Sequence, residues 1–283
     1  MTLTRANANG FLDTAVDPAL WTALIPAAGR GTRLGFDQPK ILFPIAGKTI
    51  LEWLVELLRP LCSCFVFVLS PSGREPVEHL ASTLLPGRYH IAVQKEPRGM
   101  ADAVQRGLEA LLIEPRAGRG PTPQWDRSPA CPLETLHTLI VWGDQVALRP
   151  ESLEFAMRVH QGPAQPSATC PTLLRDNPYI HFERDNAGRV TQVLQAREGD
   201  SLPPHGESDS GVFLFRTDAL RQLLPRLLTS GECIGNKTRE LNFLPIFAMI
   251  DDLITLPIMT ETESVGVNSA ADAEYLARHL AGA

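Results

Sequence analysis

The chain has 283 residues, of which 44% are hydrophobic and 20% are charged, a composition typical of folded globular proteins. Its length suits one large α/β domain or two small ones. The formal net charge of −6 gives no basic field of the kind that neutralises a phosphate backbone, so a nucleic-acid partner is not expected.

Membrane insertion and secretion are not expected either. The longest apolar runs have the length of strands, well short of the roughly 20 residues that a membrane helix needs. The N-terminus has no basic segment followed by an apolar one, so it does not resemble a signal peptide. The cysteines form no CxxC pair and are predicted to be reduced thiols of a cytoplasmic protein. They are Cys62, Cys64, Cys131, Cys170 and Cys233.

The first 160 residues alternate between strand-like and helix-like patterns. Residues 1–20 have no sustained periodicity and are expected to form a loose or docking N-terminal extension. Segment 114–133, rich in Pro, Gly and Arg, is expected to be an exposed insertion. The alternation predicts βαβ units and a mostly parallel sheet. The expected strands are 22–28, 64–69, 90–94 and 136–144, and the expected helices are 49–58, 75–85, 99–112 and 151–160.

After residue 160 the pattern changes to consecutive strands, which predicts an antiparallel section added to the parallel one. A turn is expected at Asp185, Asn186 and Gly188. A final helix is expected after an N-cap at Asn268 or Ser269. The expected strands are 168–174, 179–184, 190–196, 211–215, 254–258 and 265–267, and the further helices are 217–228 and 240–250.

The strongest candidate for a site is the segment LIPAAGRGTRLGFDQPKILFPIAGK, residues 24–48. Its small residues let the backbone pass close to a ligand and point N–H groups at a phosphate. Arg33 adds a planar bidentate donor and Lys40 a mobile point charge. A plain tight turn is the alternative, because the segment matches neither a P-loop nor a dinucleotide fingerprint. The small residues are Ala27, Ala28, Gly29 and Gly31.

The complete string, a strand followed by AAGxGTRL and then by PK, resembles the nucleotide-binding signature of the sugar-phosphate nucleotidyltransferases. Within that GT-A-like family, the N-acetylglucosamine-1-phosphate uridyltransferases are the most similar. The resemblance places Thr32 in the nucleotide site. It implies an α/β fold with a three-layer, Rossmann-like, mixed and mostly parallel sheet. In a single domain over 21–283, about 21–160 would bind nucleotide and about 161–283 the acceptor.

A second segment, QKEPRGMADAVQRGL at 94–108, resembles the base-recognition segment of the family. By that match Gln94, Gly99 and Met100 belong to the nucleotide site. An amide can read a base edge with both a donor and an acceptor, and a glycine lets a flat ring approach the backbone. Outside this context Gln94 would be an ordinary polar residue at the end of a strand.

A third element is Asp144, which follows a buried strand and so is expected at the carboxyl edge of the sheet, where ligands of open parallel sheets bind. The resemblance assigns Asp144 and Asn268 to a Mg²⁺ site, and both offer the hard oxygen ligands that this ion prefers. The alternatives are an N-cap or turn role for Asp144 and a helix cap for Asn268.

These parts imply a reaction. A phosphate oxygen of a sugar 1-phosphate attacks the α-phosphorus of a nucleoside triphosphate, with UTP favoured, and pyrophosphate leaves. The nucleophile is already an anion, so no general base is needed. Arg33 and Lys40, with Mg²⁺, would relieve the repulsion between the two anions.

The acceptor side departs from the family pattern. The expected glycine turn is replaced by DNPYIHFER at 176–184, and the family glutamate and Asn-Thr-Gly are replaced by Gln195 and by DSG at 209–211. Tyr179, Gln195 and Ser210 are the candidate acceptor-binding residues. These departures leave open a cytidylyltransferase that acts on a phosphorylated alcohol or amine.

Two further expectations concern the whole chain. A non-catalytic, nucleotide-sugar-sensing subunit is the alternative of another class, but its mark would be loss of Arg33, Lys40 or Asp144, and all three are present. The hexapeptide-repeat acetyltransferase domain of the family is missing, so transferase activity alone is expected. The base, the acceptor and the oligomeric state, with a homo-oligomer as one alternative, stay open.

Overall fold

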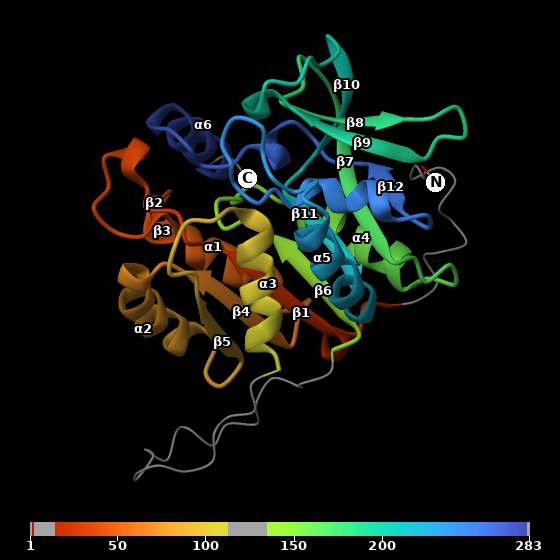
Figure 1. The fold of residues 1–283 in the computed structure, drawn as a ribbon. Coiled ribbons are helices and arrows are strands. Elements are labelled where there is room, and N and C mark those ends of the chain that lie inside the picture. The colour runs from red at the N-terminus through yellow and green to blue at the C-terminus, as the bar shows by residue number, and fades with distance from the viewer. Residues whose placement is uncertain (1, 3–14, 113–134, 282–283) are drawn as a thin grey trace. The chain divides into compact units, whose positions relative to one another are not determined.

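A computed structural model describes residue 2 and residues 15–112 and 135–281 of the chain (Figure 1). The insertion expected at 114–133 and most of the N-terminal extension lie outside the described residues. The chain packs as two compact units, each built from segments that are distant in sequence. The parallel-sheet unit comprises Asp17–Pro97, Ala103–Val146 and Gly266–Ala283, and the mixed-sheet unit comprises Met1–Val16, Arg98–Asp102 and Ala147–Val265. None of the described helices could span a membrane.

The parallel-sheet unit is built on four parallel strands in the order β6-β1-β4-β5, which lie side by side in Figure 1. Every residue of β1 and β4 is buried, which explains why both segments are apolar apart from Thr22, whose hydroxyl pairs with that of Thr135. The strands are β1 (Trp21–Pro26), β4 (Cys64–Leu69), β5 (Tyr89–Val93) and β6 (His137–Val141), with a small antiparallel pair, β2 (Pro44–Ile45) and β3 (Lys48–Thr49).

Helix α1 of this unit begins at a recognisable cap. Thr49 and Glu52 form a capping box, in which each side chain accepts a hydrogen bond from the backbone N–H of the other, and α1 starts directly after Thr49. The helices are α1 (Ile50–Leu58), α2 (Arg74–Leu84), most of α3 (Met100–Ala110) and α6 (Ala270–Ala281).

The mixed-sheet unit is organised around β7 (Ala168–Asp176). This strand is antiparallel to β10 (His205–Asp209) and β11 (Val212–Arg216) and parallel to β12 (Ile254–Pro257). A hairpin of β8 (Ile180–Arg184) and β9 (Val190–Gln195) forms a separate two-stranded sheet, whose strand β8 packs against β10. Phe213, Phe215 and Phe247 pack their rings together in the core. The helices of the unit are α4 (Pro150–Gln161) and α5 (Thr217–Ser230).

The expected α/β fold, with a parallel core followed by an antiparallel section, is confirmed. The turn expected at 185–188 is also present, with the Asp185 carboxylate accepting hydrogen bonds from the backbone N–H groups of Ala187 and Arg189. Strand β10 was not predicted, because HGESD is polar. Its Glu207 is nevertheless buried, and it forms an ion pair with Arg184 at 2.6 Å.

Three other expectations are wrong. Instead of a helix over 240–250, only Leu244–Met249 is helical, as a 3₁₀ segment, because Pro245 favours a helix start. A strand over 265–267 is reduced to a single bridge between Gln145 and Gly266. Cys64 is disulfide-bonded and is not the reduced thiol that was expected. The expectation failed because sequence spacing does not tell which cysteines a fold brings together. Cys62, Cys170 and Cys233 are free thiols, and Cys131 lies outside the described residues.

Candidate active site

The glycine loop after β1 turns back on itself and so positions Lys40. The backbone N–H of Lys40 donates to the carbonyl of Gly29 at 3.1 Å, which closes the loop. Gly31 adopts a φ of 69°, and a Cβ there would lie 3.4 Å from Lys40 Cα, so this turn requires glycine. Gly29 has no such constraint, since a Cβ would meet only ordinary contacts. Arg33 is exposed and forms no ion pair among the described residues.

Asp144 lies beside this loop because Gly143 lets the end of β6 cross closely over the end of β1. The Gly143 N–H donates to the Pro26 carbonyl at 3.1 Å. A Cβ at Gly143 would lie 2.7 Å from that oxygen and 2.9 Å from Ala27 Cβ. Since β1 and β6 are adjacent parallel strands, Asp144 stands at the carboxyl edge of the sheet, as predicted.

Asn268 reaches the same place from the C-terminal end of the chain. The Val267 N–H donates to the Asp144 carbonyl at 2.9 Å, next to the bridge between Gln145 and Gly266. A Cβ at Gly266 would lie 3.0 Å from the Asp144 carboxylate oxygens, so glycine leaves that carboxylate its space. Sequence reasoning missed Gly266. The signal that could have found it is its place in the string VGVN.

The orientation of Asn268 is set by its neighbours. Its Nδ2 donates to the Gly266 carbonyl at 3.2 Å, which leaves Oδ1 free to face the site. Ser269, and not Asn268, caps helix α6, because the Ser269 hydroxyl accepts from the Asp272 N–H at 3.2 Å. The Asp272 carboxylate accepts in turn from the Ser269 N–H at 2.8 Å. The capping alternative for the Asn268 side chain is therefore removed.

The ammonium group of Lys40 joins these residues. Lys40 Nζ lies 2.6 Å from Asp144 Oδ2 and 2.8 Å from Asn268 Oδ1. The side chains of Lys40 and Asp144 are only 17% and 20% exposed. A carboxylate and an amide oxygen thus converge on one cationic centre, held by segments that are distant in sequence.

This donor set fits a divalent cation with a preference for oxygen, because the two oxygens already face a point occupied by positive charge. In the described ranges 15–112 and 135–281, no three His, Cys, Asp or Glu side chains gather into a metal cluster. Mg²⁺ does not need such a cage, since it keeps several waters and binds substrate phosphates. Binding of Mg²⁺ by Asp144 and Asn268 stays a prediction.

The residues predicted to contact the base lie in two segments. Gln94 is buried directly after β5, and its N–H donates to the Leu69 carbonyl at 2.8 Å. Gly99 has a φ of 115°, and a Cβ there would lie 2.5 Å from the backbone N of Leu241. The fold therefore requires this glycine for packing. Met100, half-buried, opens α3. The contact of all three with a base stays a prediction.

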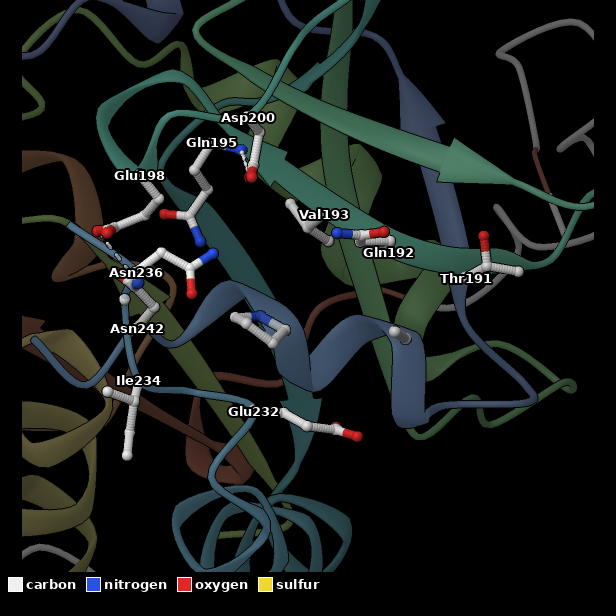
Figure 2. Close-up of a pocket in the computed structure, with 13 residues that line it drawn as sticks. Thr191, Gln192, Val193, Gln195, Glu198, Asp200, Glu232, Ile234, Asn236 and Asn242 are labelled. Atoms are coloured by element: carbon white, nitrogen blue, oxygen red, sulfur yellow. Dashed lines mark hydrogen bonds between the residues drawn. The ribbon is translucent and has the colours of Figure 1, made fainter. Parts of the chain in front are cut away.

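On the predicted acceptor side, the mixed-sheet unit contains a cavity of about 360 Å³. Figure 2 shows Gln195, Glu198 and Asn242 near one another at one end of this pocket, with Thr191 at the other end. The Gln195 side chain is buried. Among the lining residues are Gln192, Gln195, Glu198, Asn236, Asn242 and Pro245.

The other two candidate acceptor residues lie in different surroundings. Tyr179 is 55% exposed, and its carbonyl accepts from the Ala196 N–H at 3.0 Å. Ser210 is buried, and its hydroxyl donates to the Pro171 carbonyl at 2.8 Å. Neither residue is among those lining the cavity. Their contact with an acceptor stays a prediction.

The neighbouring Asp209 has an unusual acidity. Burial raises the pKa of its carboxyl to about 6, although a hydrogen bond from the Gly211 N–H and the charge of Arg175 act in the opposite direction. This carboxyl stands in the DSG string where the family has an amide. Sequence reasoning identified the replacement but not its effect on the pKa.

Known proteins resemble the chain in both sequence and fold. The bifunctional protein GlmU of Desulfitobacterium hafniense (strain Y51) is 28% identical, with 91% of this chain and 52% of that protein covered. The GlmU protein of Gloeobacter violaceus is 27% identical, with 91% and 51% covered. The chain therefore spans about half the length of the curated relatives it matches.

Among solved structures, HddC from Yersinia pseudotuberculosis has a TM-score of 0.57 at 13% identity, covering 92% of this chain and 99% of that one. This likeness shows a shared fold. The model of the MobA-like NTP transferase domain matches residues 23–207, which include the glycine loop, Lys40 and Asp144. The resemblance seen in the sequence motifs is thus confirmed, and the chain belongs to the MobA-like NTP transferase domain family of nucleotidyltransferases.

Proposed function

We propose that the protein transfers a nucleotidyl group from a nucleoside triphosphate, with UTP favoured, to a sugar 1-phosphate in a Mg²⁺-dependent reaction. A phosphate oxygen of the acceptor forms a bond to the α-phosphorus. The bond between the α-phosphorus and the bridging oxygen breaks, and pyrophosphate leaves with the electron pair. The products are a nucleotide sugar and pyrophosphate. The observation that carries the proposal is the convergence of Lys40, Asp144 and Asn268 beside the glycine loop.

Each residue has a physical task in this reaction. Asp144 and Asn268 would hold Mg²⁺, which when bound supplies positive charge to the triphosphate. Arg33, exposed at the turn of the loop, binds phosphate oxygens through its planar fork. Lys40 places a mobile ammonium where negative charge develops on the leaving group. The loop backbone offers N–H groups to phosphates, as glycine loops in other phosphate sites do.

A sugar acceptor is supported by the polarity of the cavity. Gln195, Asn236 and Asn242 are amides, and each can donate and accept hydrogen bonds, as the hydroxyl groups of a sugar require. The volume of about 360 Å³ lies within the range of small-molecule sites. UTP is favoured because the sequence motifs are most similar to those of uridyltransferases.

The experiment is a pyrophosphate-release screen. It crosses the four common ribonucleoside triphosphates with sugar 1-phosphates and with phosphorylated alcohols and amines, with and without Mg²⁺. The proposal expects release with UTP and at least one sugar 1-phosphate, only when Mg²⁺ is present, and no release by the Asp144→Ala variant. Release with CTP and a phosphorylated alcohol or amine would replace the sugar acceptor. No release from any pair would refute catalysis and favour a sensing subunit.

A further inference from the structure

The carboxylate of Glu198 holds the loop 233–242 in place. Glu198 follows β9 in a short 3₁₀ turn, and its side chain is only 4% exposed. Its Oε2 accepts from the backbone N–H groups of Lys237 and Thr238 at 3.0 and 3.1 Å. Its Oε1 accepts from the Thr238 hydroxyl at 2.6 Å. The same oxygen accepts from Asn242 Nδ2 at 3.3 Å, a bond drawn in Figure 2.

The loop is shaped around this carboxylate. A Cβ at Gly235 would lie 2.5 Å from Glu198 Oε2, so the loop can approach the carboxylate only with glycine there. Burial raises the pKa of Glu198, but the hydrogen bonds from Thr238, Lys237 and Asn242 outweigh it and lower the pKa to about 2. The group is therefore ionised at neutral pH, where each donor meets a full negative charge.

The far end of the loop holds the start of helix α3. The Leu241 N–H donates to the Arg98 carbonyl at 2.7 Å, and the Leu241 carbonyl accepts from the Ala101 N–H at 2.9 Å. Between these two bonds lies Gly99, where a Cβ would lie within 2.6 Å of both the N and the O of Leu241. The loop therefore fixes the backbone from 98 to 101.

The same loop forms part of the wall of the cavity. Gly235, Asn236 and Asn242 line the cavity together with Glu198 and Gln195. One loop thus connects the cavity proposed for the acceptor with the segment that carries Gly99 and Met100, the residues predicted to contact the base. Glu198 is the buried charge that holds this loop.

We propose that Glu198 is a positioning residue. Through the loop 233–242 it fixes the position of one wall of the acceptor cavity and the position of the start of α3, which is predicted to contact the base. It acts on the substrates through other residues. The assignment of the two ends to acceptor and base rests on the proposed function. The effect of Glu198 on the backbone positions of Leu241 and Ala101 does not depend on the proposed function.

Glu198→Gln is the decisive variant, because it removes the negative charge that the four donors share and leaves a single side-chain oxygen as acceptor. Thr238→Val is a milder variant that removes only the hydroxyl donor. It replaces Glu198→Gln as the test variant if Glu198→Gln fails to fold. Glu263→Gln is the matched control. Glu263 is a carboxylate of the same unit, 1% exposed, that also accepts from backbone N–H groups, those of Arg149 and Thr260.

The first measurement is amide hydrogen exchange in the full chain without substrates. Loss of acceptors for buried donors is expected to speed exchange at Leu241 and Ala101 at least about tenfold in Glu198→Gln, and less in Thr238→Val. Glu263→Gln is expected to lower the Tm without changing exchange at these two amides. Unchanged exchange at Leu241 and Ala101 in both loop variants would overturn the proposal.

The second measurement is steady-state kinetics with the substrates that the screen identifies. Glu198→Gln is expected to raise KM for both substrates about tenfold, while kcat changes less than about threefold. A change in only one KM would overturn the two-sided role. If the wild-type protein releases no pyrophosphate from any pair, the proposed function fails, and hydrogen exchange alone decides whether Glu198 holds Leu241 and Ala101.

Discussion

Replacing Lys40 with methionine removes the ammonium group from its place between Asp144 Oδ2 and Asn268 Oδ1 and keeps most of the apolar side chain. This ammonium neutralises Asp144 and occupies the position that a divalent cation would need. The two cations therefore compete for the same oxygens. The variant is expected to bind a divalent cation more tightly than the wild-type protein while losing turnover.

The magnitude follows from the exposure of the pair. The two side chains are 17% and 20% exposed, so their interaction lies between that of a surface ion pair and that of a buried charged hydrogen bond, about 1–2 kcal/mol. Removing a competitor of that strength corresponds to a gain in cation affinity of roughly 5- to 30-fold.

The assay is titration of nucleotide-free protein with Mn²⁺, followed by the paramagnetic resonance signal of free Mn²⁺ and repeated with Mg²⁺ by calorimetry. Lys48→Met is the control, because Lys48 pairs with Glu56 at the surface. Its cation affinity is expected to equal that of the wild-type protein. Equal or weaker Mn²⁺ binding by Lys40→Met would refute the competition and place the cation elsewhere.

Three further changes test the site and its surroundings. Gly266→Ala puts a Cβ 3.0 Å from the Asp144 carboxylate, so it is expected to weaken Mn²⁺ affinity with little change in Tm; unaltered affinity would contradict the close approach. Arg33→Ala is expected to lower kcat/KM about 100-fold without changing the Tm, because it removes an exposed phosphate donor; equal kcat/KM would remove Arg33 from the site. The raised pKa of Asp209, about 6, means that folding stability due to this group falls as pH rises from about 4 to 6. Asp209→Asn is expected to lack that fall in urea unfolding at pH 4.5 and 7.5, and parallel pH profiles would count against the raised pKa.

The centre of the parallel core could be predicted from sequence because β1 and β4 are buried along their whole length. Apart from Thr22, both strands consist of apolar residues, and the Thr49–Glu52 capping box marks the start of α1. Strand β10 could not be predicted, since Glu207 is tolerated in the interior through its ion pair with Arg184 and a hydrogen bond from the Thr172 hydroxyl. Partners that come from another strand leave no trace in the local pattern.

For the candidate site, the sequence motifs predict that Asp144 and Asn268 lie together but not how they are arranged around Lys40. The motifs assign Asp144 and Asn268 to one metal site, and the structure brings them together through the Val267–Asp144 backbone bond. The Lys40 ammonium lies between them because the Lys40 N–H bonds to the Gly29 carbonyl and so closes the loop. The spacing of residues in the sequence does not predict this closure. The space that Gly266 leaves for the carboxylate is equally a property of the packed chain.

Gly99 is required by the fold itself, independently of the base contact predicted for it. The sequence argument assigned its missing side chain to the approach of a base, yet the fold already uses that space for the N and O atoms of Leu241. Gly99→Ala would disturb the start of α3 whether or not a nucleotide binds there, so loss of activity in that variant would say nothing about base recognition. Gln94 already has a side chain, so a substitution there can remove the amide that could read a base edge without adding a Cβ. Substitutions at Gln94, and not at Gly99, are therefore the ones that test which nucleobase is selected.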